Sequence, residues 1–249
     1  GLAAPKSGST GDGYAFAKSF GHTVIAPYPA LVRLLCKGRG LKKLSGLRAR
    51  ATVRLLIANK ERCREYGEVQ FNADGLSGIP VMSLSRLALH AVAQNEDVRI
   101  ALNLFPQDLT EEEERGLLSE LIYTNGWGKT LKEALTGLIS EEFAEVLLRD
   151  VFGKQVSEKS RGSHVSSVGG LSSAAGMMDT KKAASQTSKK EFERLHFAIT
   201  NLTFQVVGSK GFDAAQTTAG GIPLREIDAA TFESKLQKGL YLCGELLDV

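Results

Sequence analysis

The sequence predicts an α+β fold in which an antiparallel, barrel-like β unit contains a small helical subdomain and is flanked at both ends by segments of α/β character. Three observations support this fold class. Runs rich in Val, Leu and Ile occur in the first half of the chain and return near residue 200. Helix-start signals fill the stretch between them. Both ends carry glycine-rich turns next to short apolar runs.

The β unit is predicted from runs of apolar residues at strand length, several of them bounded by turn residues. The predicted turn at 59–64 would join two of these strands in a hairpin, and the loop 38–46 is rich in glycine and lysine. Closing such strands into a barrel or sandwich removes exposed sheet edges, which favours that arrangement. The predicted strands are 30–35, 51–58, 66–71, 98–105, 198–207 and 212–216.

The helices are predicted from capping residues followed by apolar stripes. Asp12 is expected to cap a helix ending at Ser19, with Gly21 just beyond its C-terminus. Thr110 precedes four glutamates, and Ser140 precedes another acidic turn, so both predict helix starts. The stretch 155–175 is rich in Ser and Gly and predicts a loop. Further helices are predicted at 80–94, 129–139, 140–152 and 183–196.

The composition describes an ordinary globular chain. Its 249 residues, 43% hydrophobic and 24% charged, can bury the cores of one or two domains. No run approaches 18 apolar residues, and no basic-then-apolar leader opens the sequence. We therefore expect no membrane span, no secretory signal and a cytoplasmic location.

Charge and cysteine usage predict no nucleic-acid partner and no metal. The 31 basic and 28 acidic residues nearly balance, and the basic clusters at 37–43 and 48–50 are predicted to be solvated loops. Cys36, Cys63 and Cys243 are widely separated, which argues against disulfides and zinc. The four histidines do not stand at metal-ligand spacing from any Cys, Asp or Glu.

The two ends carry the features that suggest a ligand site. Gly11, Asp12 and Gly13 form a turn that feeds a helix N-terminus, where backbone N–H groups suit polar or anionic ligands. This turn is not a P-loop, because it lacks the Gly-Lys-Ser/Thr ending. It is not a dinucleotide fingerprint either, because no G-x-G-x-x-G follows a strand here. Near the other end, Gly220 and Gly221 precede a strand predicted at 222–227.

A second strand near the C-terminus is predicted at 240–242, where an apolar run lies between glycines. This strand would deliver Gly244 and Glu245 to its carboxyl end, the position where open α/β sheets bind ligands. A carboxylate placed there can accept hydrogen bonds from ligand hydroxyls. The alternative is that Glu245 is an ordinary surface carboxylate.

These end segments resemble one protein family. The motifs T-x-G-G-I at 218–222, E-S-K at 233–235 and G-L-Y-x-x-G-E-x-L-D-V at 239–249 are similar to those of bacterial FAD-dependent oxidoreductases of the aminoacetone-oxidase-like (YhiN/BaiN-like) flavoprotein family. The turn G-S-T-G-D-G-Y at 8–14 also matches that family. The resemblance implies that residues 1–26 and 217–249 are parts of a Rossmann-like FAD-binding domain.

The same resemblance implies the organisation of the middle of the chain. Residues 27–108 and 190–216 would form an antiparallel β insert, and residues 109–189 a helical subdomain with the Ser/Gly-rich loop. The family's N-terminal G-x-G-x-x-G motif and its C-terminal continuation are not among these residues. We therefore expect a truncated segment that binds FAD weakly and is inactive alone.

The resemblance also implies roles for individual residues. Gly11, Asp12 and Gly13 would lie near the ribityl or dimethylbenzene side of FAD, and Gly220 and Gly221 near the isoalloxazine. Glu245, after Gly244, would accept hydrogen bonds from the ribityl hydroxyls. No residue can be assigned to catalysis.

The residues Gly75, Ser77, Gly78 and His22 are candidates for the substrate pocket. Gly75, Ser77 and Gly78 belong to a G-L-S-G block that the family shares, although glycines and hydroxyls are also what a helix start uses. His22 follows the helix-ending Gly21, where a structural role explains it equally well.

Two functions therefore stand as hypotheses. The first is a segment of an FAD-dependent oxidoreductase that transfers hydride between a small-molecule substrate and the flavin, with NAD(P)H as a possible donor. In this case the insert covers the flavin and forms the substrate pocket. The second is a non-catalytic binding module without a cofactor.

Overall fold

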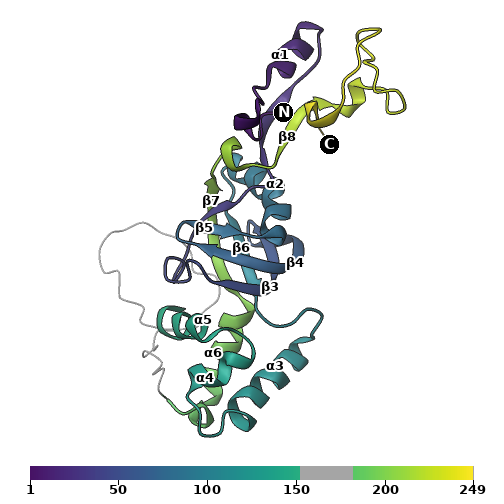
Figure 1. The fold of residues 1–249 in the computed structure, drawn as a ribbon. Helices are drawn as coiled ribbons and strands as arrows, with labels where there is room; N and C mark the ends of the chain where they lie inside the picture. The colour runs from purple at the N-terminus through teal and green to yellow at the C-terminus, as the bar shows by residue number, and fades with distance from the viewer. Residues whose placement is uncertain (152–181, 249) are drawn as a thin grey trace, which may run out of the picture.

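A computed structural model describes residues 1–151 and 182–248, and shows three regions stacked along one axis (Figure 1). A terminal lobe built from both ends of the chain lies at one end. A β-barrel occupies the middle, and a helical subdomain lies at the other end. None of the helices in these described ranges is both long and apolar enough to cross a membrane. The predicted loop at 155–175 lies outside the described residues.

The barrel confirms the prediction of a closed antiparallel sheet. Its six strands follow the order β2-β5-β4-β3-β6-β7, and every neighbouring pair is antiparallel. Apolar side chains alternate into the interior, as in the burial pattern of β3. The strands are β2 (Leu34–Lys37), β3 (Arg48–Ile57), β4 (Lys60–Asn72), β5 (Gly75–Ser77), β6 (Val98–Asn103) and β7 (Leu202–Ser209).

The longest hairpin of the barrel turns earlier than predicted. Ala58 and Asn59 both have positive φ, at 50° and 61°, and form a two-residue turn between β3 and β4. This is the geometry that best matches the twist of paired strands. Residues 60–64, predicted as turn, are therefore the start of β4. The register shifts once, between Leu55 and Leu56, which adds a bulge to the hairpin.

The predicted strand 30–35 is wrong, because it is two strands in two different sheets. β1 (Ile25–Ala30) pairs with β8 (Thr217–Pro223) in the terminal lobe, whereas β2 belongs to the barrel. Leu31 has φ 46°, so the chain breaks direction between them. Helix α2 (Ile79–Ala93), whose predicted range is confirmed, lies at the end of the barrel that faces the terminal lobe (Figure 1).

The terminal lobe contains α1 (Asp12–Ser19) and the three-stranded sheet β1-β8-β9. The range of α1 is as predicted, and Gly21 has the predicted left-handed conformation at φ 89°. Its N-cap, however, is Gly11, so Asp12 is the first helical residue rather than the cap.

Both strands predicted near the C-terminus are wrong. Instead of 222–227, the strand is β8, which begins at Thr217 and ends at Pro223 before a 3-10 turn. Residues 240–242 form no strand, since only Tyr241 makes an isolated bridge, to Glu233. The strand that pairs with β8 in parallel is β9 (Leu247–Asp248), which follows Gly244 and Glu245 rather than preceding them.

The helical subdomain begins where the capping signals predicted. Thr110 and Ser140 cap α3 (Glu111–Ser119) and α5 (Glu141–Val146), and Thr110 forms a complete capping box with Glu113. Between them lies α4 (Leu131–Ala134).

The last helix, α6 (Lys189–Thr200), continues further than predicted, so residues 198–200 are helical and the following strand, β7, begins only at Leu202. Residues 212–216, predicted as a strand, hold the 3-10 turn Phe212–Ala214.

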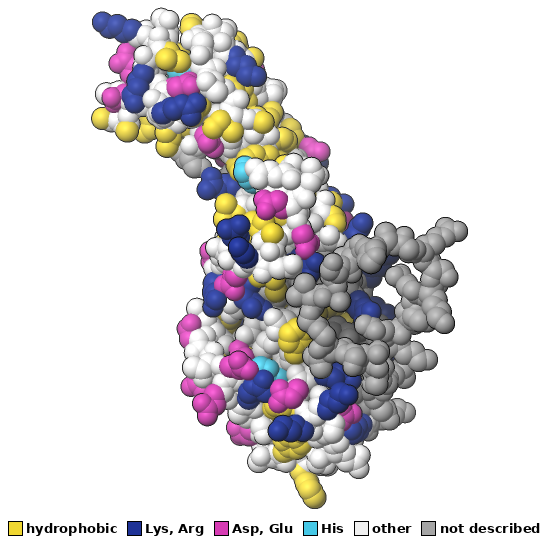
Figure 2. All heavy atoms as spheres, turned by 180° about the vertical axis from the view of Figure 1, so that it is seen from behind, with side chains coloured by type: hydrophobic (Ala, Val, Ile, Leu, Met, Phe, Trp, Pro, Cys, Tyr) yellow, Lys and Arg dark blue, Asp and Glu magenta, His cyan; other side chains and the backbone are white. Residues whose placement is uncertain are grey.

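The buried side chains form one large and one small core. The large core runs without a break from the barrel into the helical subdomain, and includes Phe71, Phe204 and Phe143. The small core lies in the terminal lobe, around Ile222 and Leu247. Figure 2 shows hydrophobic side chains gathered over the surface of the terminal lobe, where they alternate with charged groups. The two cores therefore correspond to two unequal parts of the molecule.

Candidate functional site

The structure brings together the glycine-rich turns from the two ends of the chain. The hydroxyl of Tyr14 in α1 donates a hydrogen bond to the backbone oxygen of Glu245 at 2.9 Å. A Cβ at Gly13 would lie 3.1 Å from the Leu246 side chain, so the two turns are in contact. Gly11, Asp12, Gly13, Gly244 and Glu245 thus share one surface of the terminal lobe.

Glu245 is held by the backbone of β8. Its carboxylate oxygen Oε2 accepts a hydrogen bond from the N–H of Thr218 at 3.2 Å. The hydroxyl of Thr218 in turn accepts hydrogen bonds from the N–H groups of Leu2 and Ala3, at 2.8 and 3.0 Å. Three segments of the chain therefore fix the position of this carboxylate, while the side chain stays exposed and can accept further hydrogen bonds.

The surroundings of Glu245 fit a polar cofactor with hydroxyl groups. Gly244 has φ 67°, and the space that a Cβ would occupy there is open to 4 Å. Asp12 is exposed in the neighbouring turn, where its carboxylate accepts a hydrogen bond from the N–H of Gly13. An oriented carboxylate beside two glycine-containing turns is a suitable site for the sugar-like part of a nucleotide cofactor.

Gly220 and Gly221 lie inside the terminal sheet. Both are buried, with φ 78° and 120°. A Cβ at Gly220 would lie 2.7 Å from the backbone oxygen of Ala26, and one at Gly221 would lie 2.5 Å from that of Leu246. The close packing of β8 against its neighbours therefore already requires glycine at both positions. Their approach to a flavin ring stays a prediction.

His22 is buried, and both of its ring nitrogens are engaged. Nδ1 lies 2.9 Å from the Glu226 carboxylate, and Nε2 lies 2.8 Å from the Ser234 hydroxyl. Burial raises the pKa of the Glu226 carboxyl, but hydrogen bonds from Thr23 and His22 outweigh this and keep the pKa below its usual value. This arrangement favours the structural alternative for His22 over a position in a substrate pocket.

The order Ser234, His22, Glu226 has the hydrogen-bond pattern of a nucleophilic triad, but the environment does not suit that chemistry. Ser234 is buried, and its hydroxyl oxygen accepts hydrogen bonds from the N–H groups of Leu236 and Gln237. A nucleophile needs an accessible oxygen with a free lone pair. The network therefore ties the end of α1 to the C-terminal loops.

Gly75, Ser77 and Gly78 lie in and next to β5, within the wall of the barrel. A Cβ at Gly75 would lie 1.9 Å from the backbone oxygen of Leu34, and one at Gly78 would lie 2.2 Å from that of Glu68. The Ser77 hydroxyl accepts a hydrogen bond from Asn72 at 3.1 Å. These contacts explain the two glycines by packing, and a role facing a substrate stays a prediction.

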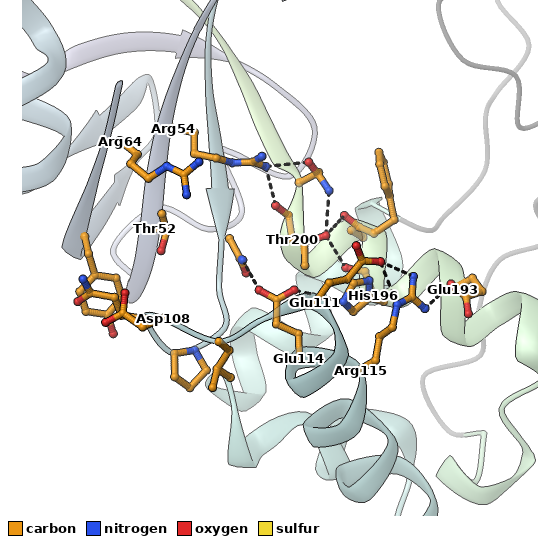
Figure 3. Close-up of a pocket in the computed structure, with 18 of the residues that line it drawn as sticks. Thr52, Arg54, Arg64, Asp108, Glu111, Glu114, Arg115, Glu193, His196 and Thr200 are labelled. Carbon is orange, nitrogen blue, oxygen red and sulfur yellow. Dashed lines mark hydrogen bonds and ion pairs between the residues drawn. The ribbon is translucent and has the colours of Figure 1, made fainter. Parts of the chain in front are cut away.

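A large cleft, which the sequence did not predict, opens between the barrel and the helices α3 and α6 (Figure 3). Its volume is about 1290 Å³, and most of the residues that line it are polar or charged. One wall is the outer face of β3 and β4, which carries Thr52, Arg54 and Arg64. The opposite walls come from α3 and from α6, which carries His196.

The acidic side chains on the α3 side of the cleft are largely paired. Glu114 is buried and accepts a hydrogen bond from Asn103 at 2.6 Å. Its second oxygen lies 3.4 Å from Nε2 of the buried His196, and this nitrogen makes no hydrogen bond within the described residues. Arg115 forms ion pairs with Glu111 and with an acidic residue of α6, Glu193.

The described residues contain no group of three or more His, Cys, Asp or Glu side chains that could hold a metal ion. Cys36, Cys63 and Cys243 are free thiols in the part of the chain that the structure describes. Burial raises the pKa of the Cys36 thiol to about 12, so this side chain stays protonated and unreactive.

Comparison with known proteins identifies the family. The sequence pattern of the HI0933-like protein Rossmann domain matches residues 1–249. A 3-dehydro-bile acid delta(4,6)-reductase of Clostridium scindens is 30% identical over the whole chain, which covers 54% of that protein. A ribosomal RNA dihydrouridine synthase of Haemophilus influenzae is 26% identical, also over the whole chain, which covers 52% of it.

The chain thus spans about half the length of these curated relatives. A ribosomal RNA dihydrouridine synthase of Escherichia coli is 31% identical over 64 residues, which are 26% of this chain and 16% of that protein. The flavoprotein resemblance of the two ends is confirmed. On the match over its full length, the chain belongs to the HI0933-like Rossmann-domain family.

Proposed function

We propose that this chain is part of an FAD-dependent oxidoreductase, and that its terminal lobe forms one side of the flavin site. One observation supports this most directly. Two glycine-containing turns more than 200 residues apart in sequence meet through the hydrogen bond from Tyr14 to Glu245, and both expose backbone beside a fixed carboxylate. A contact between the two turns is what a single cofactor bound by both would require.

The residues of this lobe would bind and orient the cofactor. Glu245 would accept hydrogen bonds from the ribityl hydroxyls, because Thr218 already holds the carboxylate in place. Gly11, Asp12, Gly13 and Gly244 would supply polar contacts from backbone and carboxylate. The space beside Gly244 is open, whereas Cβ atoms at Gly11 and Gly13 would meet Leu2 and Leu246. When bound, FAD supplies the capacity to accept and return a hydride, and the protein supplies position and electrostatics. Gly220 and Gly221 are buried in β8, so they would contact the flavin ring only if the ring lay against this sheet.

The barrel and the helical subdomain would form an insert that covers the flavin and shapes the substrate pocket. β1 lies in the terminal sheet, so we place the first boundary of the insert after residue 30 and its return near residue 217. Gly75, Ser77 and Gly78 lie near the start of α2, which is the helix nearest the terminal lobe (Figure 1). We propose a small-molecule substrate and NAD(P)H as the electron donor.

The test is FAD binding by the natural protein that contains this sequence, measured by flavin fluorescence and absorbance. Glu245→Gln keeps the size of the side chain and removes its charge, so it should weaken FAD binding about tenfold. Glu96→Gln is the matched control, because it removes an exposed acidic charge elsewhere on the surface. Equal affinity in the Glu245→Gln variant and the wild-type protein would exclude the proposed role of Glu245.

The alternative is a binding module without a cofactor. A protein that is colourless when purified and binds no added FAD would support this alternative and overturn the oxidoreductase proposal. A protein that binds FAD, and whose flavin NAD(P)H reduces, would support the proposal. The reduction would be followed as a loss of flavin absorbance at about 450 nm, and it should be about as fast as turnover.

A further inference from the structure

The wall of the cleft formed by the barrel carries two arginines directly opposite each other. Arg54 of β3 and Arg64 of β4 are cross-strand partners in the antiparallel hairpin, so their side chains leave the sheet on the same face. Thr52 and Tyr66 are the adjacent cross-strand pair on that face, and all four residues line the cleft. Figure 3 shows the side chains of Arg54 and Arg64 side by side.

Like charges directly opposite each other destabilise a sheet, and within the described residues the charge of Arg54 has no carboxylate partner. Nη2 of Arg54 donates to the backbone oxygen of Thr200 and to the side-chain oxygen of Asn201, at 2.9 and 2.7 Å, and both acceptors are neutral. Its Nε is buried and has no acceptor in the part of the chain that the structure describes. Among the described residues, Arg54 makes no ion pair with a carboxylate, and Arg64 pairs only with the partly exposed Glu61.

The acids of the cleft are mostly engaged with other groups. Arg115 pairs with Glu111 and Glu193, while Glu114 accepts a hydrogen bond from Asn103. The remaining acids of the lining, Glu65 and Asp108, are exposed to solvent. A half-buried guanidinium without a counter-charge is costly, and a bound anion would supply the missing charge.

We propose that this cleft binds a phosphate group, held by Arg54 and Arg64 with hydroxyl contacts from Thr52 and Tyr66. Two adjacent guanidinium groups match the charge of a phosphate better than that of a single carboxylate, and their N–H groups suit its several oxygen atoms. Lys190 of α6 also lines the cleft and adds positive charge from the opposite side.

The site differs from the proposed flavin site in position. It lies at the end of the barrel next to the helical subdomain, whereas the turns that contain Gly11 and Gly244 lie in the terminal lobe at the other end (Figure 1). The volume of about 1290 Å³ exceeds what a phosphate alone would need. The phosphate would therefore belong to a larger molecule, either a free nucleotide or an RNA strand.

The experiment is calorimetric titration of the natural protein with three probes at low ionic strength: inorganic phosphate, adenosine monophosphate and a short oligouridylate. Saturable binding of at least one probe is expected. Arg64→Gln should weaken this binding about tenfold, because the variant loses charge-assisted hydrogen bonds to the phosphate. The Arg64 side chain is exposed, so the substitution should not disturb folding. Arg54→Gln should weaken it at least as much.

The matched control is Arg48→Gln. Arg48 lies in β3, as Arg54 does, but it forms an ion pair with Glu68 and does not line the cleft. It should change the affinity less than twofold. If Arg54→Gln fails to fold, as judged by circular dichroism, the exposed Arg64→Gln variant still decides the question.

The outcomes separate the possibilities. Tighter binding of the oligouridylate than of adenosine monophosphate, with affinity that falls steeply as salt rises, identifies RNA as the source of the phosphate. Equal or tighter binding of the mononucleotide or of inorganic phosphate identifies a free ligand. No saturable binding of any probe, or equal losses in Arg48→Gln and Arg64→Gln, would overturn the proposal.

Discussion

The terminal lobe and the rest of the molecule differ in how they are held together. The barrel and the helical subdomain share one continuous core, in which side chains from strands and helices interdigitate. The terminal lobe has a separate and much smaller core, consisting of Ala17, Ile222, Ile227, Leu242 and Leu247. Hydrophobic burial scales with buried area, so the terminal lobe gains far less stability from its own core.

The terminal lobe also exposes large hydrophobic side chains. Phe16 of α1 is 64% exposed, and Phe20, the C-cap residue of α1, is 48% exposed. Phe232 and Tyr241 in the C-terminal loops are 48% and 62% exposed. Figure 2 shows this hydrophobic surface. Polar networks, such as those around His22 and Thr218, therefore contribute a larger share of the folding stability in this lobe than in the barrel.

The largest expected effect comes from the shared core. Phe71 is fully buried, and its ring meets those of Phe143 in α5 and Phe204 in β7 at 5.2 and 6.0 Å between centroids. Phe71→Ala should lower the free energy of unfolding by about 3–5 kcal/mol. Hydrogen exchange measured by mass spectrometry should then accelerate in the barrel and the helical subdomain together.

The matched variant in the terminal lobe is Leu242→Ala, which truncates a buried side chain of the small core. It should accelerate hydrogen exchange in α1 and β8 only. If Phe71→Ala accelerated exchange in the barrel and left α5 protected, the barrel and the helical subdomain would not share one cooperative core.

The second effect separates a glycine that packing requires from one that it does not. Gly75→Ala would place a Cβ 1.9 Å from the backbone oxygen of Leu34, so β2 and β5 would have to separate. We expect a loss of about 2–3 kcal/mol in urea denaturation. Gly116→Ala in α3, where nothing lies within 4 Å, should instead stabilise the protein by about 1 kcal/mol. The same sign in both variants would contradict the packing argument.

The smallest effect concerns pH and the start of α6. Burial raises the pKa of Glu191, but hydrogen bonds from Lys182 and Ser188 outweigh it and lower the pKa from 4.5 to about 2. A carboxylate with a lowered pKa in the folded state stabilises the protein above pH 4.5, and this contribution is lost as the pH falls towards 2.

Glu191→Gln should therefore reduce the melting temperature at pH 7 and leave it nearly unchanged at pH 2. Glu112→Gln, an exposed glutamate in the first turn of α3, is the control and should show a smaller difference between the two pH values. An equal loss for Glu191→Gln at both pH values would show that its charge is not what stabilises the helix start.

Local signals in the sequence predicted the elements whose ends are set by local chemistry. Thr110 and Ser140 cap helices because their hydroxyls accept backbone N–H groups three residues later, and this depends on nothing distant. The break at Leu31 could not be predicted, since a leucine with φ 46° is set by two sheets that meet there. Residues 198–200, Ala-Ile-Thr, suit either helix or strand, and only packing places them in α6.

The candidate sites divide in the same way. Family motifs predicted that the turns containing Gly11 and Gly244 belong together, and the contact between Tyr14 and Glu245 agrees with this. The cleft was missed because the opposition of Arg54 and Arg64 depends on the register of the hairpin, which includes a bulge. The near balance of charge over the whole sequence does not reveal that two arginines lie opposite each other on one face of the barrel.

The chain leaves and re-enters the terminal lobe at a single point. The N–H of Gln216 donates a hydrogen bond to the backbone oxygen of Leu31 at 3.2 Å, so exit and return lie side by side. A unit joined to its host at adjacent positions can be replaced by a short bridging loop without altering the strands on either side. A short loop from Leu31 to Gln216 would therefore be long enough to keep β1 paired with β8.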